Sequence, residues 1–270
     1  MMGKIIVDNI SVTYKENNAN FEALKNVSFT IQDGEFVSII GSSGCGKSTL
    51  LSVLEGILPQ TSGHVYINNK EVVGTGTDRG VVFQNYSLFP WLSAKNNIIF
   101  GLQQKNKKLS KDELEKIADD YLEKVNLTEF ADKYPCQLSG GQQQRVAIAR
   151  ALAMDTDILL MDEPFGAIDP KNRSSLQELL LKLWEDEKGK KKTVVFVTHD
   201  IDEAIFLSDR IVMMASKPGH VYKEISVPFV RPRLRSNFFQ SDAYNHLRNE
   251  LVSLFYKDVA DRIGNEEVVL

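Results

Sequence analysis

Short apolar runs separated by turn residues dominate the first forty positions of the chain. The segments KIIVDNISVTY (4–14), ALKNVSFTI (23–31) and EFVSII (35–40) are rich in β-branched residues, and QDGE separates the last two. Such runs are typical of β-strands joined by tight turns. HVYIN (64–68), after the turn signal TSG, predicts another short strand. We therefore expect an antiparallel β-subdomain at the N-terminus.

Further along, apolar runs alternate with helical patterns. The runs VVFQ (81–84), DILLMDEP (157–164), TVVFVT (193–198) and RIVMMA (210–215) predict buried strands. Helices are expected over 109–126, where Ser110 and Glu113 form a capping box, from about Gln142, from Pro170 with Asp169 as its cap, and over 200–208. The alternation indicates an α/β core with a mostly parallel sheet. The helical stretch 85–157 interrupts this pattern and is expected to be an inserted subdomain.

Composition and charge exclude several classes of protein. Hydrophobic residues make up 43% of the 270 positions and charged residues 25%, and the net charge is −4. A general nucleic-acid binder would need clustered Lys and Arg, but only 188–192 and 231–235 are basic, and we interpret the first as a solvated loop. The two cysteines are too few for a disulfide framework, so the expected compartment is a reducing cytoplasm. The sequence also predicts no signal peptide and no membrane-spanning run.

GSSGCGKST (41–49) fits the phosphate-loop pattern G-x-x-x-x-G-K-[ST]. It follows the strand EFVSII and precedes the helical STLLSVLEGIL, which is the context in which this pattern binds nucleotides. Backbone N–H groups would curl around phosphate oxygens, Lys47 would bind the terminal phosphates, and Ser48 would bind Mg²⁺. The alternative, a glycine-rich turn, fits this context poorly. The expected nucleotide-binding residues are Gly41, Ser42, Ser43, Gly44, Cys45, Gly46, Lys47, Ser48 and Thr49.

ILLMDEP (158–164) places two acids at the end of a predicted parallel strand, where α/β sheets bind ligands. Asp162 is suited to Mg²⁺ through water, and Glu163 to polarising an attacking water. His199 and Gln84 each follow another such strand. A lone histidine is more often structural than catalytic, and the Gln84 amide could bind metal or cap a turn, so the residues alone leave both roles open. His64, His220 and His246 are given no role.

QLSGGQQQRVAIARA (137–151) contains a second candidate anion site. Paired glycines before a helix leave N–H groups that can bind phosphate, and the donors would be Ser139, Gly140, Gly141 and Gln142. The sequence thus raises the question of why one chain carries two phosphate sites.

In this order, the phosphate loop, LSGGQ, LLMDEPFGAID and VFVTHDIDEA resemble the nucleotide-binding subunit of an ABC transporter over residues 5–230. The resemblance implies that Tyr14 stacks on adenine and that Gln84 senses Mg²⁺ and the attacking water. It also makes Glu163 the catalytic carboxylate and His199 the switch that contacts the γ-phosphate. GAID departs from the family's Ser-Ala-Leu-Asp at Gly166 and Ile168, and Asp169 supplies its acid.

The same resemblance implies a head-to-tail dimer with a second copy of this chain, in which each LSGGQ closes over ATP held by the other. It further implies Mg²⁺, a membrane permease, indirectly an extracytoplasmic solute-binding protein, no nucleic acid, and a peripheral place on the cytoplasmic face of the membrane. The expected division is an ATPase domain over 1–230, with core 1–84 and 158–230 and helical insertion 85–157, and a helical extension over 231–270.

Two segments suggest a subfamily and a docking surface. DRGVVFQNYSLFPWLSAKNNIIFGL (78–102) and PFVRPRLR (228–235) resemble the ATPases of nitrate, sulfonate and taurine importers, and related importers carry pyrimidine precursors. Leu88, Phe89, Pro90 and Trp91 form an apolar cluster that is either subdomain core or a docking groove for a permease helix. A soluble ABC ATPase, a GTPase and a non-hydrolysing regulator are the alternatives; no N-K-x-D motif supports a GTPase, and Glu163 argues against the regulator.

Overall fold

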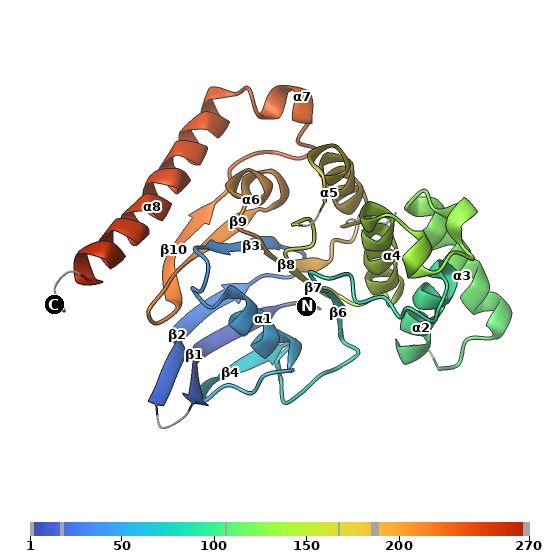
Figure 1. Ribbon diagram of the computed structural model, residues 1–270, viewed down its shortest axis with the longest axis horizontal. Helices are drawn as coiled ribbons and strands as arrows, with labels where there is room; N and C mark the ends of the chain where they lie inside the picture. The colour runs from blue at the N-terminus through green and yellow to red at the C-terminus, as the bar shows by residue number, and fades with distance from the viewer. Residues whose placement is uncertain (1–2, 17–18, 106, 167, 185–188, 267–270) are drawn as a thin grey trace.

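The computed structural model describes residues 3–16, 19–105, 107–166, 168–184 and 189–266. Two sheets pack against each other, and a group of helices stands to one side of them (Figure 1). The antiparallel sheet has the order β2-β1-β4-β5, with β1 Ile5–Glu16, β2 Ala19–Ile31, β4 Ser62–Ile67 and β5 Lys70–Glu71. The predicted N-terminal β-subdomain is therefore present, but β2 begins at Ala19 rather than at the expected residue 23.

The second sheet has the order β10-β9-β3-β8-β7-β6. Its strands are β3 Phe36–Gly41, β6 Arg79–Val82, β7 Ile158–Asp162, β8 Thr193–Val197, β9 Arg210–Ala215 and β10 His220–Ser226. All neighbouring pairs are parallel except β9 and β10. The fold class, a P-loop α/β core, is confirmed. The pattern did not predict β10, whose side chains are mostly exposed and therefore carry little apolar signal.

Alternation along β3 explains how both faces of this sheet are filled. Val37 and Ile39 pack toward the antiparallel sheet, with helix α1 (Lys47–Glu55) in the same cluster. Phe36 and Ile40 point to the opposite face, where α5 (Pro170–Trp184) and α6 (Ile201–Leu207) pack. Because successive strand residues face opposite sides, one fully buried strand serves two cores.

Three helices lie between β6 and β7 in the sequence, although these two strands are neighbours in the sheet. They are α2 (Ala94–Lys105), α3 (Lys111–Lys124) and α4 (Gly140–Ala153). Short 3₁₀ turns at Thr128–Phe130 and Pro135–Gln137 connect α3 to α4. The capping box of Ser110 and Glu113 is formed as predicted. However, α4 begins at Gly140, two residues before the expected start, because Ser139 and Gln142 form a second capping box. The bounds 85 and 157 of the insertion stay a prediction.

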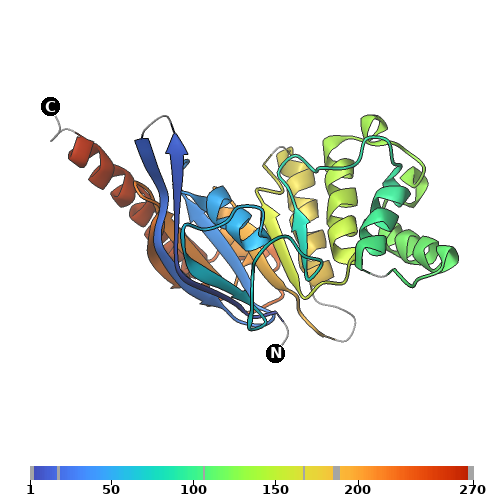
Figure 2. The same ribbon diagram turned by 90° about the horizontal axis from the view of Figure 1, so that it is seen from below.

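The last described elements are α7 (Arg235–Phe238) and α8 (Asp242–Glu266). Figure 2 shows α8 at the end of the molecule opposite to α2, α3 and α4. Among the described residues, no helix is both long enough and apolar enough to cross a membrane.

Candidate functional site

Four neighbouring parallel strands bring the predicted site residues to one edge of the second sheet. In the order β3, β8, β7, β6, each strand runs in the same direction, so their carboxyl ends lie together. The phosphate loop follows β3, His199 follows β8, Asp162 ends β7, and Gln84 lies two residues beyond β6. This edge is where ligands of open α/β sheets bind.

The phosphate loop forms a tight turn between β3 and α1. Gly44 and Gly46 have φ of 79° and 92°, a left-handed backbone that favours glycine. A Cβ on Gly46 would also lie 2.5 Å from Leu24 Cδ2. The loop therefore turns its backbone into the N-terminus of α1, which begins at Lys47. A helix N-terminus presents free N–H groups and a partial positive charge to anions.

Lys47 is buried although it carries a charge. Its Nζ donates to the carbonyl oxygens of Gly41 at 2.8 Å and Ser42 at 3.1 Å, so the loop itself holds the ammonium in place. Cys45 is completely buried under the loop, and the cavity described next is lined by its neighbours Gly44 and Gly46 rather than by its thiol.

A cavity of about 490 Å³ lies over the phosphate loop. Its lining joins loop residues to the catalytic candidates Glu163 and His199, but not to the third candidate Gln84, and to three residues of the antiparallel sheet. The lining residues are Tyr14, Phe21, Ala23, Ser43, Gly44, Gly46, Lys47, Ser48, Thr49, Glu163 and His199. Residues from β1 and β2, and from the segments that follow β7 and β8, thus meet the loop in one place.

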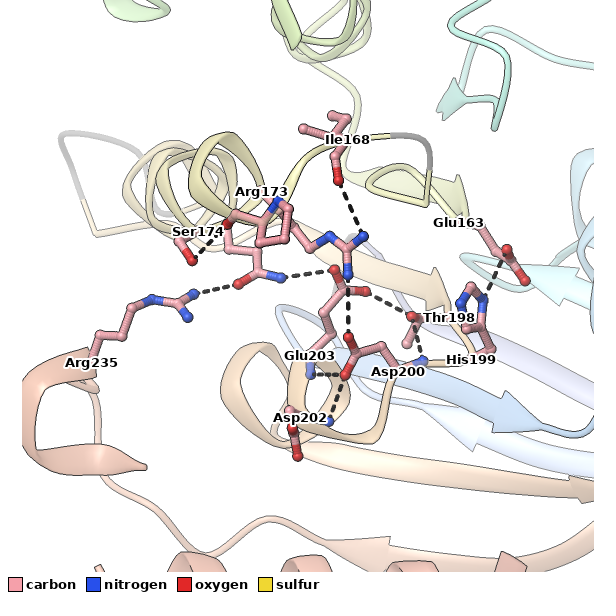
Figure 3. A network of polar contacts seen from close by, with 12 residues as sticks. Glu163, Ile168, Arg173, Ser174, Thr198, His199, Asp200, Asp202, Glu203 and Arg235 are labelled. Carbon is pink, nitrogen blue, oxygen red and sulfur yellow. Dashed lines mark hydrogen bonds and ion pairs between the residues drawn. The ribbon is translucent and has the colours of Figure 1, made fainter. Parts of the chain in front are cut away.

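The side chains of Glu163 and His199, which both line the cavity, point toward each other (Figure 3). Glu163 Oε2 lies 3.1 Å from His199 Nδ1. The Glu163 backbone has φ of 40°, unusual for a residue with a side chain, and its N–H donates to Val197 O at 2.9 Å, which fixes the turn. Such strained positions cluster at functional sites. His199 is more exposed than Glu163, with 64% against 21% of the side chain accessible.

Asp162 and Ser48 form the oxygen pair that a Mg²⁺ ion would need. The Ser48 hydroxyl donates to Asp162 Oδ1 at 3.4 Å. Burial raises the pKa of the Asp162 carboxyl, and the neighbouring charge of Glu163 raises it further, while the Ser48 hydrogen bond lowers it. Hard oxygen donors that leave room for water and phosphate fit Mg²⁺. In the described ranges, no cluster of three or more His, Cys, Asp or Glu could hold a metal alone, so the remaining ligands would come from nucleotide and water.

Two exposed aromatic rings form the outer wall of the cavity. Tyr14 on β1 and Phe21 on β2 are cross-strand partners and are 37% and 59% exposed. Tyr14 was predicted from the family resemblance, whereas Phe21 was missed because the strand was expected to begin two residues after it. Phe21 and Ala23 lie two residues apart on β2 and both line the cavity, but this placement depends on the pairing of β2 with β1, which no local pattern reveals.

The second phosphate motif lies elsewhere. Ser139 caps α4 and accepts from Gln142 N at 3.3 Å, and none of the four motif residues lines the cavity. A Cβ on Gly140 would instead meet the Tyr86 hydroxyl, and one on Gly141 would meet Asn172. Ser139 and Gly140 are exposed. The two phosphate motifs therefore do not form one site within a single chain.

The apolar cluster after Gln84 divides into two parts. Leu88 packs against the larger core, whereas Phe89 lines a mostly apolar groove of about 420 Å³ with Phe83, Phe100 and Arg150. Asn97, fully buried, clamps the backbone of Phe89 by donating to its carbonyl at 3.2 Å and accepting from its N–H at 2.9 Å. Gln84 itself is exposed at the start of this segment, and Trp91 is 69% exposed.

A strand–phosphate loop–helix unit, with an acidic strand end beside it, defines a P-loop protein that binds nucleoside triphosphates. Comparison with known proteins narrows the class. Residues 24–166 match the sequence model of the ABC transporter family. The nitrate import ATP-binding protein NrtD of Synechococcus elongatus is 44% identical, over 96% of this chain and 93% of its own length.

Two further relatives support the same family assignment. The taurine import ATP-binding protein TauB of Ruegeria pomeroyi is 38% identical over 98% of this chain and 99% of its own. A solved dimeric ATP-binding cassette, in a post-hydrolysis state with ADP and phosphate, is 40% identical with a TM-score of 0.74 and covers 84% of this chain and 100% of its own. The chain therefore belongs to the ABC transporter family. The predicted resemblance and the ATPase class are both confirmed.

Proposed function

We propose that this chain is the ATP-hydrolysing subunit of an import system for small polar solutes of the nitrate, sulfonate or taurine type. One observation carries the enzymatic part: Lys47, Ser48, Glu163 and His199 line a single cavity at the carboxyl ends of the parallel strands. The solute class is supported by the similarity to NrtD and TauB.

Phosphoryl transfer depends on positioning and charge stabilisation more than on covalent help from the protein. In this proposal Lys47 and the loop N–H groups hold the β- and γ-phosphates, and Tyr14 stacks on the adenine. Ser48 and Asp162 would hold Mg²⁺, with Gln84 after the strand next to that of Asp162, and the ion would supply charge neutralisation at the phosphates. Glu163 orients and polarises the attacking water, while His199 contacts the γ-phosphate from the side of the cavity that Glu163 faces.

Closure of a dimer would complete the site. Ser139, Gly140, Gly141 and Gln142 lie outside the cavity of their own chain, so their donors can act only on a nucleotide held by a second copy. ATP would then favour the closed dimer because it gains contacts there that the open state lacks. The dimeric relative with ADP and phosphate supports this arrangement.

The groove beside Phe89 is the proposed docking site for a cytoplasmic helix of the permease. It lies next to Gln84, and Arg150 of α4 donates to Ser87 O at 2.8 Å and to Tyr86 O at 3.2 Å. The groove is thereby fastened both to the segment after Gln84 and to the helix that begins at the second phosphate motif. Such a chain would sit on the cytoplasmic face of the membrane and serve a solute-binding protein indirectly.

Glu163→Gln tests the enzymatic part. The variant should bind ATP but hydrolyse it at least about a hundredfold more slowly, because general-base catalysis contributes that much. Asp157→Asn, at the opposite end of β7, is the matched control and should leave the rate unchanged. A near-normal rate for Glu163→Gln in the purified protein would remove Glu163 from this role.

Copurification tests the transport part. A tagged chain should bring down an integral-membrane permease from solubilised membranes, and Phe89→Asp should abolish this association while ATP binding persists. Recovery of the chain without a membrane partner, from cells that express its neighbouring genes, would favour a soluble ABC ATPase instead.

A further inference from the structure

The extension after residue 230 is fastened to α6, the helix that begins two residues after His199. Arg233, 7% exposed, donates from Nη1 to the carbonyl oxygens of Ile205, Phe206 and Ser208 at 2.8, 2.9 and 2.8 Å. These carbonyls belong to the C-terminal turn of α6, where helices leave acceptors unsatisfied. Farther along, Tyr244 and Arg248 both donate to Asp202 Oδ1 at 2.7 Å. The extension thus binds both ends of α6.

A second set of contacts runs from the extension through the interior to Thr198, the residue before His199 (Figure 3). Arg235, at the start of α7, donates to Gln177 Oε1 on α5. Gln177 Nε2 donates to Glu203 Oε1 at 2.8 Å, and Thr198 Oγ1 donates to Glu203 Oε2 at 2.7 Å.

Thr198 holds the peptide on both sides of His199. It precedes His199 directly, and its hydroxyl also accepts from Asp200 N, the residue that follows, at 3.0 Å. Asp200 in turn accepts from the N–H groups of Asp202 and Glu203 and so caps α6. A shift of the Thr198 hydroxyl would therefore move the backbone from which the His199 side chain projects.

Loss of a hydrogen-bond partner by Gln177 or Glu203, in the middle of this network, would destabilise the folded state. Gln177 and Glu203 are 4% and 6% exposed. Burial raises the pKa of the Glu203 carboxyl, and the hydrogen bonds from Thr198 and Gln177 oppose that rise. An unpaired polar group in such surroundings costs more than the hydrogen bond contributes, so the members of the network keep or lose their arrangement together.

We propose that Arg235 of the C-terminal extension is a positioning residue for His199, acting through Gln177, Glu203 and Thr198. The extension then helps to set the catalytic geometry of the ATPase in addition to packing against α6. This inference rests on the proposed role of His199 in ATP hydrolysis.

Arg235→Leu in the full-length chain is the test. Leucine keeps apolar contact with Phe206, over whose ring the guanidinium lies at 4.4 Å, but cannot donate to Gln177. The expected result is a roughly two- to thirtyfold lower kcat at unchanged KM. Arg235→Lys, which can still donate to Gln177, should recover most of the rate.

The imidazole NMR signals of the chain provide a readout independent of catalysis. The His199 signal, identified by its loss in His199→Ala, should shift in Arg235→Leu and return in Arg235→Lys. Lys223→Ala is the matched control: it removes the 2.9 Å ion pair to Glu250 that joins β10 to α8, so it loosens the extension without touching the network, and should leave both kcat and the His199 signal unchanged.

The outcomes separate the two hypotheses. A wild-type kcat and an unmoved His199 signal in Arg235→Leu would overturn the positioning role. Equal effects of Arg235→Leu and Lys223→Ala would also overturn it, since packing of the extension would then suffice. A normal rate for His199→Ala would instead refute the proposed role of His199, while the NMR signal would still report whether Arg235 positions it.

Discussion

Helices α1 and α4 both begin within glycine-containing phosphate motifs, yet their N-termini lie in different surroundings. At α1, Lys47 is buried and a cavity unites the loop with Glu163, His199 and Tyr14. At α4, Ser139 is exposed and uses its hydroxyl to cap its own helix. A helix N-terminus offers donors in both places, but only α1 adds a cation and carboxylates to them.

The difference explains why one chain carries both motifs. The α1 site can hold a nucleotide by itself, whereas the α4 motif has donors that lie outside the cavity over the phosphate loop. A motif of this kind becomes useful when a second copy brings a nucleotide to it. Changes at α1 should therefore affect binding in the monomer, and changes at α4 should affect only steps that require the dimer.

Lys47→Ala should have the largest effect on ATP binding. Removal of a buried charged partner of the phosphates should weaken affinity by roughly thirtyfold or more, since such losses cost about 2–5 kcal/mol. Titration calorimetry with the monomeric protein measures this directly. Lys25→Ala, an exposed lysine paired with Glu22, should bind as the wild type does, and equal affinity of the two variants would show that the loop does not hold phosphate.

Ser139→Ala should separate hydrolysis from binding. ATP affinity of the monomer should stay within about twofold, while the hydrolysis rate should fall about tenfold, the equivalent of one charge-assisted hydrogen bond. Ser110→Ala is a closely matched control, because Ser110 also caps a 14-residue helix through a capping box. Both variants should lose about 1 kcal/mol of stability, and a similar loss of hydrolysis in both would contradict a special role for Ser139.

Tyr14→Ala and Phe21→Ala should each weaken ATP affinity by about two- to tenfold, because aromatic contacts contribute roughly 0.5–1.5 kcal/mol beyond burial. Fluorescent-nucleotide binding would measure the effect. Tyr134→Ala, another exposed aromatic at 47% exposure, should bind normally. If Tyr14→Ala weakened ATP affinity and Phe21→Ala did not, the surface on which adenine stacks would be limited to β1.

Glu55, at the opposite end of α1 from Lys47, should change stability with pH. Burial, aided by the charge of Asp162 and opposed by Arg79, raises its pKa from 4.5 to about 7. Between these values the folded state keeps a proton that the unfolded chain has lost, so the free energy of unfolding falls as pH rises through this window.

Glu55→Gln should remove that fall. Wild type and variant should be about equally stable near pH 4, and the variant should be more stable at pH 8 by on the order of 3 kcal/mol. Urea denaturation at both pH values measures the difference. Parallel pH profiles for the two proteins would show that Glu55 ionises in the folded state as it does in the unfolded chain.

The contrast between α1 and α4 also shows what sequence reasoning could reach. The strand before the phosphate loop and the acids after DILLM were predictable, because buried parallel strands are continuous apolar runs. Phe21 was not, since its function depends on the cross-strand register with Tyr14. Glu55 was not either, because its burial arises from tertiary packing that no local pattern encodes.

The network behind His199 was equally beyond the sequence. Arg235 and Gln177 are separated by 58 positions, and the basic run 231–235 had no predicted role beyond its resemblance to the importer ATPases. In the structure, Arg231 and Arg233 use their charge on backbone carbonyls of α6 and the loop after it. Long-range polar contacts of this kind leave no periodic pattern in the sequence from which they could be predicted.

ATP-dependent association of Glu163→Gln tests the central claim, that the α4 motif completes a site on a second copy. Sedimentation of the full-length variant should show monomers without nucleotide and dimers with ATP and Mg²⁺, and the added change Ser139→Arg should keep it monomeric with ATP still bound. Monomers at all ATP concentrations, even beside the permease, would contradict the account, as would dimers that are indifferent to Ser139→Arg.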